Sequence, residues 1–115
     1  MYTVQQKDMR TKVGEPVQIV LTVTDRDGVA VDLDSGATGY TRIGRQRGQA
    51  GLAEFTNMVF DANVATVDFN TEDVEENDAQ ATGKFVIQSW IVKNGDALMV
   101  AEGTLYIDPV IDEPV

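Results

Sequence analysis

The stretch Pro16-Val17-Gln18-Ile19-Val20-Leu21-Thr22-Val23-Thr24-Asp25 has the clearest structural pattern in the chain. Its aliphatic residues recur at every second position, the period that a half-buried β-strand requires. Asp25-Arg26-Asp27-Gly28 follows, and Asp-Gly is typical of a tight turn because glycine adopts positive φ and aspartate hydrogen-bonds its own backbone. The stretch therefore predicts a strand, a turn and a short returning strand at residues 29–31.

Similar patterns predict the other strands. Asn94-Gly95 is the strongest hairpin signal in the chain, and Asp61-Ala62 is expected to join a second hairpin. Gly103 lies inside the last strand and indicates a bulge or a crossing point. The remaining strands are expected at residues 40–45, 52–60, 63–69, 84–93 and 97–107.

Residues 70–80 differ from the rest. Asn70 is a suitable N-cap, and Glu72 and Asp73 follow in the first turn, where the helix dipole favours acids. We expect one short helix or helical turn there. About seven short strands separated by turns indicate an all-β Greek-key sandwich.

Length and charge limit the possible functions. The 115 residues suit one domain, for which we expect residues 1–107, followed by an extended acidic arm at residues 108–115. There are 19 acidic and 9 basic residues, which give a net charge of −10 and a field that repels phosphate. Nucleic acid is therefore not expected as a partner.

The sequence also argues against a membrane partner. The start, Met1-Tyr2-Thr3-Val4-Gln5-Gln6, lacks the charged and apolar regions of a signal peptide. No apolar run approaches the roughly 20 residues that span a bilayer. We expect a soluble protein made in the cytoplasm.

Aspartates 25, 27, 32 and 34 form the best metal-like cluster, because Asp-x-Asp-Gly resembles the opening of a calcium loop. The match fails at Gly36, which stands where the loop needs a bidentate glutamate. We interpret the cluster as a turn followed by a solvated loop. No metal site is predicted.

The acids between Glu72 and Asp78 offer paired carboxylates, but adjacent acids on a polar segment show no sign of the burial that acid–base catalysis needs. We interpret them as a solvated acidic face. The chain has no histidine, no cysteine and no recognisable phosphate-binding loop or nucleophile elbow. We therefore expect neither enzymatic activity nor a cofactor.

Two features leave alternatives open. Arg42, Arg45 and Arg47 form either a docking patch for an acidic neighbour, which includes a second copy of the chain, or charged positions on an edge strand that prevent aggregation. Trp90 alternates with Ile87 and Ile91, so it lies either outside, in an apolar patch with Val86 and Val92, or in the sandwich core. We favour the core position for Trp90, because sandwiches commonly bury a tryptophan.

The order of turns and strands along the chain resembles that of the immunoglobulin-like N-terminal domain of phage baseplate upper proteins. In the first half, the segments that resemble the family are Gly14-Glu15-Pro16, the strand to Asp25, Asp27-Gly28 and Gly36-Ala37-Thr38. In the second half, the segments that resemble the family are Phe69-Asn70-Thr71-Glu72-Asp73, Gly83-Lys84-Phe85, Asn94-Gly95-Asp96 and Gly103-Thr104-Leu105-Tyr106-Ile107. That domain usually opens a longer protein, whereas only an acidic tail follows here. The resemblance implies an immunoglobulin-like fold and an accessory subunit in a virion.

The expected function is that of a non-enzymatic structural protein of a tailed bacteriophage, located in the virion. Its partners would be other virion proteins, as a capsid decoration or cement subunit or as a tail or baseplate component. The arm, with Pro109, Val110 and Ile111, is expected to order on a neighbour, since proline lowers the entropy lost on docking. The alternative is a free-standing carbohydrate-binding or adhesion module, which needs a cluster of exposed aromatic residues.

Overall fold

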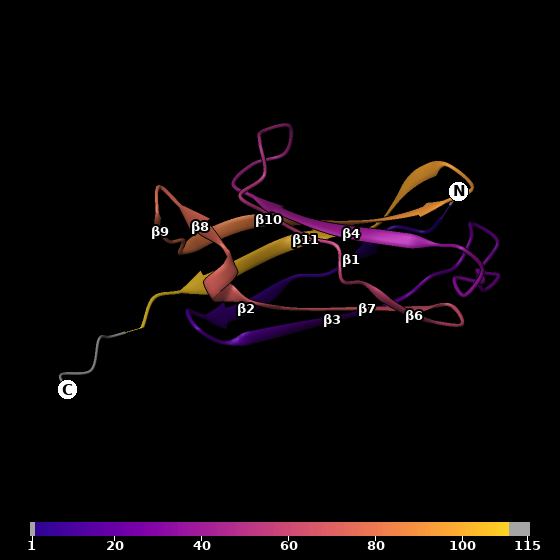
Figure 1. Ribbon diagram of the computed structural model, residues 1–115, viewed down its shortest axis with the longest axis horizontal. Helices are drawn as coiled ribbons and strands as arrows, with labels where there is room; N and C mark the ends of the chain where they lie inside the picture. Colours follow the sequence, from indigo (N-terminus) through magenta and orange to yellow (C-terminus); the bar gives the residue numbers. More distant parts are fainter. Residues whose placement is uncertain (1, 111–115) are drawn as a thin grey trace.

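Six strands form the larger of the two sheets that pack as layers in the computed structural model, which describes residues 2–110 (Figure 1). The chain of paired strands runs β1 (Gln5–Gln6), β11 (Asp96–Asp108), β10 (Gly83–Lys93), β4 (Thr38–Gly44) and β5 (Ala53–Phe55). The sixth strand, β2 (Met9–Lys12), pairs with β11 beyond β1. Both N-terminal strands run parallel to β11, and the other pairs are antiparallel.

Three antiparallel strands form the smaller sheet, in the order β3 (Pro16–Thr22), β7 (Val64–Asn70) and β6 (Val59–Asp61). The two sheets lie face to face as separate layers (Figure 1). The predicted all-β sandwich is confirmed. The finer assignment, an immunoglobulin-like Greek key, stays a prediction with which this strand order is compatible.

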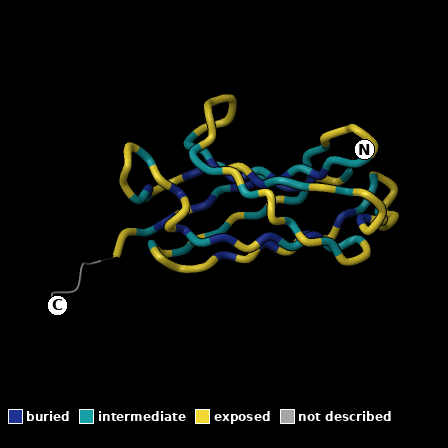
Figure 2. Tube along the Cα trace, viewed as in Figure 1, coloured by how far each residue is buried: buried dark blue, intermediate teal, exposed yellow. Residues whose placement is uncertain are grey.

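One hydrophobic core fills the space between the sheets. Along β3 and β10 every second residue is buried, as the period of two requires (Figure 2). The side chains that are largest and fully buried are Phe85, Leu21, Leu33, Ile43, Ile91, Leu105 and Ile107. Thr41 and Ser89 are the buried polar pair of β4 and β10, and their hydroxyls bond each other at 2.8 Å.

Residues 52–60 do not form the single strand that the sequence pattern predicts. The segment is divided into β5, in the larger sheet, and β6, in the smaller one. Between them Asn57 donates its side-chain amide to the carbonyl of Asp68 at 2.7 Å, which fastens the crossing segment to β7. Phe55 stacks on Phe69 with ring centroids 4.6 Å apart, so the crossing also joins the two layers.

The expected helical segment at residues 70–80 is only partly confirmed. One 3-10 turn, η1 (Thr71–Asp73), begins at Asn70, whose side chain accepts a hydrogen bond from the Glu72 N–H as predicted. The helix does not continue, because β8 (Glu75–Glu76) and β9 (Ala79–Gln80) form a small hairpin. Asn77 and Asp78 turn this hairpin with φ of 55° and 62°, a conformation that these residues tolerate better than most.

The predictions for the other turns are met to different degrees. The Asn94-Gly95 hairpin is confirmed between β10 and β11. At Gly103 an added Cβ would lie 1.9 Å from the carbonyl oxygen of Lys7, so glycine allows the N-terminal segment to cross β11 in close contact. The expected returning strand at residues 29–31 is reduced to an isolated bridge between Thr24 and Ala30. No helix among residues 2–110 has the length and apolarity to span a membrane.

Candidate binding face

The outer face of the larger sheet carries the most distinctive side chains of the molecule. On β4 and β10 the residues that alternate with the core point to this face, and the register pairs Tyr40 with Trp90 and Arg42 with Gln88. On the next strand, β11, Met99 pairs with Trp90 and Glu102 pairs with Gln88. The surface is hereafter called the outer face.

Tyr40 and Trp90 form a stacked aromatic pair on the outer face. Their ring centroids lie 5.3 Å apart with an interplanar angle of 20°. The Arg42 guanidinium covers both rings, at 4.7 Å from the centroid of Tyr40 and 5.8 Å from that of Trp90. Such cation–π contacts hold a cation over an aromatic surface.

The favoured core position of Trp90 is therefore wrong, and the alternative outward position is correct. The strand can take this phase because its inward Ser89 has a partner: the Thr41 hydroxyl removes the penalty of burying an unpaired polar group. Phe85, Ile87 and Ile91 fill the core in place of the indole.

A row of polar side chains crosses the sheet next to the aromatic pair. Arg42 donates from Nε to Glu54 Oε1 at 3.2 Å, on the neighbouring strand β5. On the other side Gln88 donates to Glu102 Oε1 at 3.0 Å. Arg47, which belongs to the loop after β4, places its Nε 2.6 Å from the same Glu102 oxygen. Both arginines thus have an internal carboxylate partner.

The loop between β4 and β5, drawn in magenta, projects from the layer that contains β4 and β10 (Figure 1). The Leu52 N–H donates to the Ile43 carbonyl at 2.7 Å and closes its base. Between this loop and the sheet lies a hollow of about 330 Å³, lined by Arg42, Ile43, Gly44, Gln46, Arg47, Gly48, Gln49, Gly51, Val86, Gln88 and Trp90. A second hollow of about 380 Å³ shares Arg42, Gln49 and Gly51 with it, so the two are adjacent.

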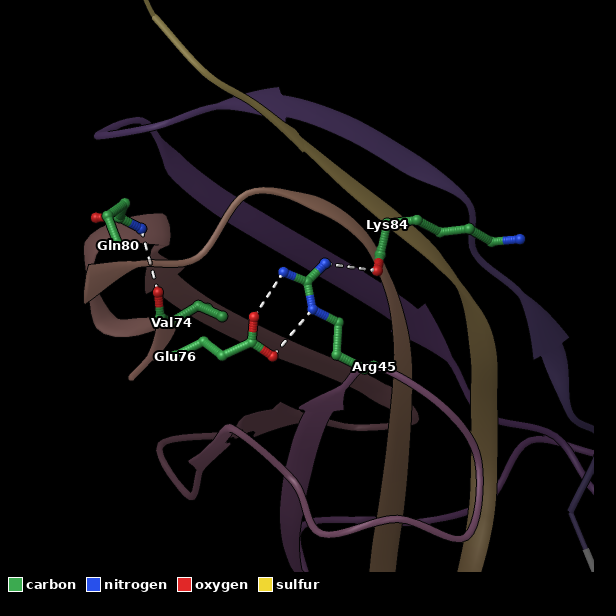
Figure 3. Close-up of polar contacts among 5 residues, drawn as sticks. All are labelled: Arg45, Val74, Glu76, Gln80 and Lys84. Atoms are coloured by element: carbon green, nitrogen blue, oxygen red, sulfur yellow. Dashed lines mark hydrogen bonds and ion pairs between the residues drawn. The ribbon is translucent and has the colours of Figure 1, made fainter. Parts of the chain in front are cut away.

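The Arg45 side chain points toward Glu76 and the backbone of Lys84 (Figure 3). It donates two hydrogen bonds to the Glu76 carboxylate, at 2.9 and 3.2 Å, and one to the Lys84 carbonyl at 3.2 Å. Its guanidinium also lies 4.2 Å from the ring centroid of Phe85. The hydrogen bonds from Arg45 hold the pKa of the Glu76 carboxyl below its usual value. Arg45 therefore fastens the β8–β9 hairpin to β10.

The structure thus brings two of the three predicted arginines to one hollow and directs the third elsewhere. Arg42 and Arg47 line the hollow, and each is ion-paired with a glutamate. Their partner-binding role stays a prediction. The pairing shows, however, that the hollow has no excess of positive charge among these four side chains.

The root of the predicted arm lies at the other end of the outer face. Arg10 forms a bidentate ion pair with Asp108, at 2.7 and 2.9 Å, and its guanidinium lies 5.5 Å from the Tyr106 ring centroid. The hydrogen bond from Arg10 lowers the pKa of the Asp108 carboxyl. Tyr106 is 38% exposed and Val110 is 49% exposed. Pro109 is also exposed, whereas Ile111 lies outside the described residues.

Two of the acidic candidates, Asp25 and Asp32, cap turns. Asp25 accepts hydrogen bonds from the Asp27 and Val29 N–H groups, and Asp32 accepts them from the Asp34 N–H and the Ser35 hydroxyl. Within residues 2–110, no three acidic side chains gather in a way that could hold a metal ion. Hydrogen bonds from the Thr104 N–H, from Arg45 and from Arg10 lower the pKa of the carboxyl groups of Asp8, Glu76 and Asp108, in that order.

Several residues of the outer face were not predicted from the sequence. Tyr40, Glu54, Gln88 and Glu102 stand beside Trp90 and Arg42. Their signal was present: Tyr40 and Arg42 alternate on one strand, as Gln88 and Trp90 do on another. Recognising them required the register that joins the two strands. In comparisons with known proteins, no family model matches the chain, and no characterised protein has significant sequence similarity to it.

Proposed function

We propose that the chain is a non-enzymatic structural protein of a tailed-phage virion, which binds other virion proteins as a capsid decoration or cement subunit or as a tail or baseplate component. The resemblance of its turns and strands to the phage baseplate domain supports the virion context. The outer face supports binding as the activity.

The observation that carries the proposal is the exposed ring of Tyr106, with Arg10, on the outer face beside the exposed Pro109 and Val110 of the predicted arm. Aromatic residues and arginine are the types enriched at the energetic centres of protein interfaces. The cluster of Tyr40, Trp90 and Arg42 lies six residue steps farther along β10, from Lys84 to Trp90, on the order of 20 Å away. Attachment centred on Tyr106 therefore does not require the Trp90 end of the outer face.

The direct test is mass spectrometry and electron microscopy of the particles of the phage that encodes the chain. We expect the protein in purified particles and a density of its size on the capsid or the tail. Absence of the chain from every purified particle would refute the virion role.

A second test uses variants added to particles that lack the protein. Tyr106→Ala should lower occupancy, because it removes the exposed ring at the arm root. Val59→Ser is the matched control: Val59 is 66% exposed but lies on the smaller sheet. Equal occupancy of both variants and the wild type would mean that attachment does not use the Tyr106 end of the outer face.

A second candidate, the free-standing carbohydrate-binding or adhesion module, is favoured by one observation. Such a module needs a cluster of aromatic residues at its surface: Tyr40 and Trp90 form a stacked pair on the outer face, each partly exposed, and Trp90 lines the hollow.

A further inference from the structure

We propose that the hollow beneath the β4–β5 loop binds a neutral saccharide, with Trp90 as its apolar surface and Arg42, Gln88 and the loop glutamines as its polar groups. The inference does not rest on the virion role. Attachment through the Tyr106 end and the arm does not require Trp90 or Arg42, and a free module would use the hollow in the same way.

The charge of the hollow selects a neutral ligand. Arg42 is paired with Glu54 and Arg47 with Glu102, so an anion or a cation would have to displace an internal partner. The net charge of −10 adds a general repulsion of anions. An uncharged ligand leaves both ion pairs in place.

The polar groups of the hollow select a hydroxyl-rich ligand. Glutamine offers both an acceptor and two donors, and Gln46, Gln49 and Gln88 all line the space. Guanidinium groups only donate, and the carboxylates beside them only accept. Hydroxyl groups do both, so sugar hydroxyls can bond to the donors and acceptors of these side chains.

The aromatic part selects a ligand with an apolar side. Trp90 and Val86 line the hollow, while Tyr40 stacks on the indole and the Arg42 guanidinium lies 5.8 Å from its ring centroid. The C–H groups of a pyranose ring can pack against the parts of Trp90 and Val86 that line the hollow while its hydroxyls point outward. This combination of an apolar surface and a few converging polar groups is typical of small-ligand sites.

The size of the space agrees with this ligand class. About 330 Å³ lies at the lower end of the range of roughly 300 to 1,000 Å³ for small-molecule pockets. The adjacent hollow of about 380 Å³, on the other side of Arg42, extends the site along the loop. We therefore expect a trisaccharide to bind more tightly than its monosaccharide.

Trp90 is the only tryptophan of the chain, so its fluorescence reports this site alone. The protein is titrated with glucose, galactose, N-acetylglucosamine and rhamnose and with trisaccharides of glucose and N-acetylglucosamine. We expect at least one to change the emission saturably, and to shift the amide NMR signals of Gly44, Gly48 and Gly51. A panel without a saturable response would overturn the proposal, as would shifts confined to residues around Tyr106.

Variants then test the named residues, with affinity measured by NMR titration because Trp90→Ala removes the fluorophore. Trp90→Ala and Arg42→Ala should each weaken binding by about tenfold or more, while Tyr106→Ala on the same face stays within about twofold. If Arg42→Ala fails to fold, Arg42→Lys takes its place, because lysine keeps the positive charge but lacks the planar guanidinium group. Unchanged affinity in the Trp90 and Arg42 variants would refute the site. Loss of saccharide binding with full particle occupancy would separate this inference from the virion role.

Discussion

The outer faces of the two sheets differ, although both sheets cover the same core. The smaller sheet exposes aliphatic and polar side chains without an aromatic ring, and its central row consists of Val59, Thr66 and Val20. The larger sheet instead carries stacked rings, arginines and paired glutamates. The outer face of an antiparallel sheet in a sandwich needs only to be stable in contact with water, and the aliphatic and polar residues of the smaller sheet meet this need. The additional chemistry of the larger sheet is therefore better explained by binding than by folding.

The largest expected effect is the difference in stability loss between a variant on the core side of β10 and a variant on its outer side. Phe85→Ala should destabilise the protein by about 3–5 kcal/mol, because it empties a fully buried site. Trp90→Ala should cost about 1 kcal/mol, the order of a lost aromatic contact. Urea unfolding of both variants gives the comparison. Equal losses would mean that Trp90 belongs to the core in energetic terms, and the contrast between the two sheet faces would fail.

A smaller effect is expected directly beneath the aromatic pair, at Thr41 and Ser89. Thr41→Val leaves the buried Ser89 hydroxyl without its partner and should cost about 1–3 kcal/mol. Adding Ser89→Ala should recover much of that loss, because no unpaired polar group then remains. If the double variant were less stable than Thr41→Val alone, the hydroxyl pair would not be what allows Trp90 to face outward.

The same pair explains where sequence reasoning succeeded and where it failed. Alternation in residues 16–25, the Asn94-Gly95 turn and the Asn70 cap are local signals, and each is confirmed. The phase of β10 is not local: it depends on Thr41, which lies on another strand and accommodates Ser89. The division of residues 52–60 depends in the same way on a distant contact, the bond from Asn57 to Asp68. The outer face could not be assembled until the register of β4 and β10 was known.

The next prediction concerns the arginine that does not join the hollow. Arg45 lowers the pKa of Glu76 from a usual value of 4.5, so the ionised carboxylate is favoured by folding. A depressed folded pKa contributes stability above the unfolded value and loses it as the pH falls through the folded pKa. Both side chains are about one third exposed, so solvent screening keeps the effect small.

The measurement compares the melting temperatures of the wild type, Glu76→Gln and the exposed neighbour variant Glu75→Gln. At pH 7 the wild type should melt a few degrees above Glu76→Gln, and the difference should shrink once the pH falls below 4.5. Glu75→Gln should follow the wild type. A difference that stays constant with pH would show that Glu76 acts through packing and that the ion pair does not hold the hairpin.

The smallest effect on stability is expected at the C-terminal arm, where the effect on binding should be large. The arm leaves the end of β11 at Asp108, whose carboxylate is held by Arg10 next to the exposed Tyr106. Deletion of residues 109–115 keeps this ion pair and removes the exposed Pro109 and Val110. The melting temperature should therefore stay nearly unchanged.

Attachment of the truncated protein to the particle should weaken markedly, because the lost contacts are intermolecular. The prolines of the arm also reduce the conformational entropy that is lost when the arm docks on a partner. Occupancy of the truncated protein on particles that lack the native one measures this directly. Trp90→Ala provides the contrast, since it should reduce saccharide binding more than occupancy. Occupancy of the truncated chain equal to that of the full chain would refute the docking role of the arm and leave the Tyr106 end of the outer face as the proposed attachment.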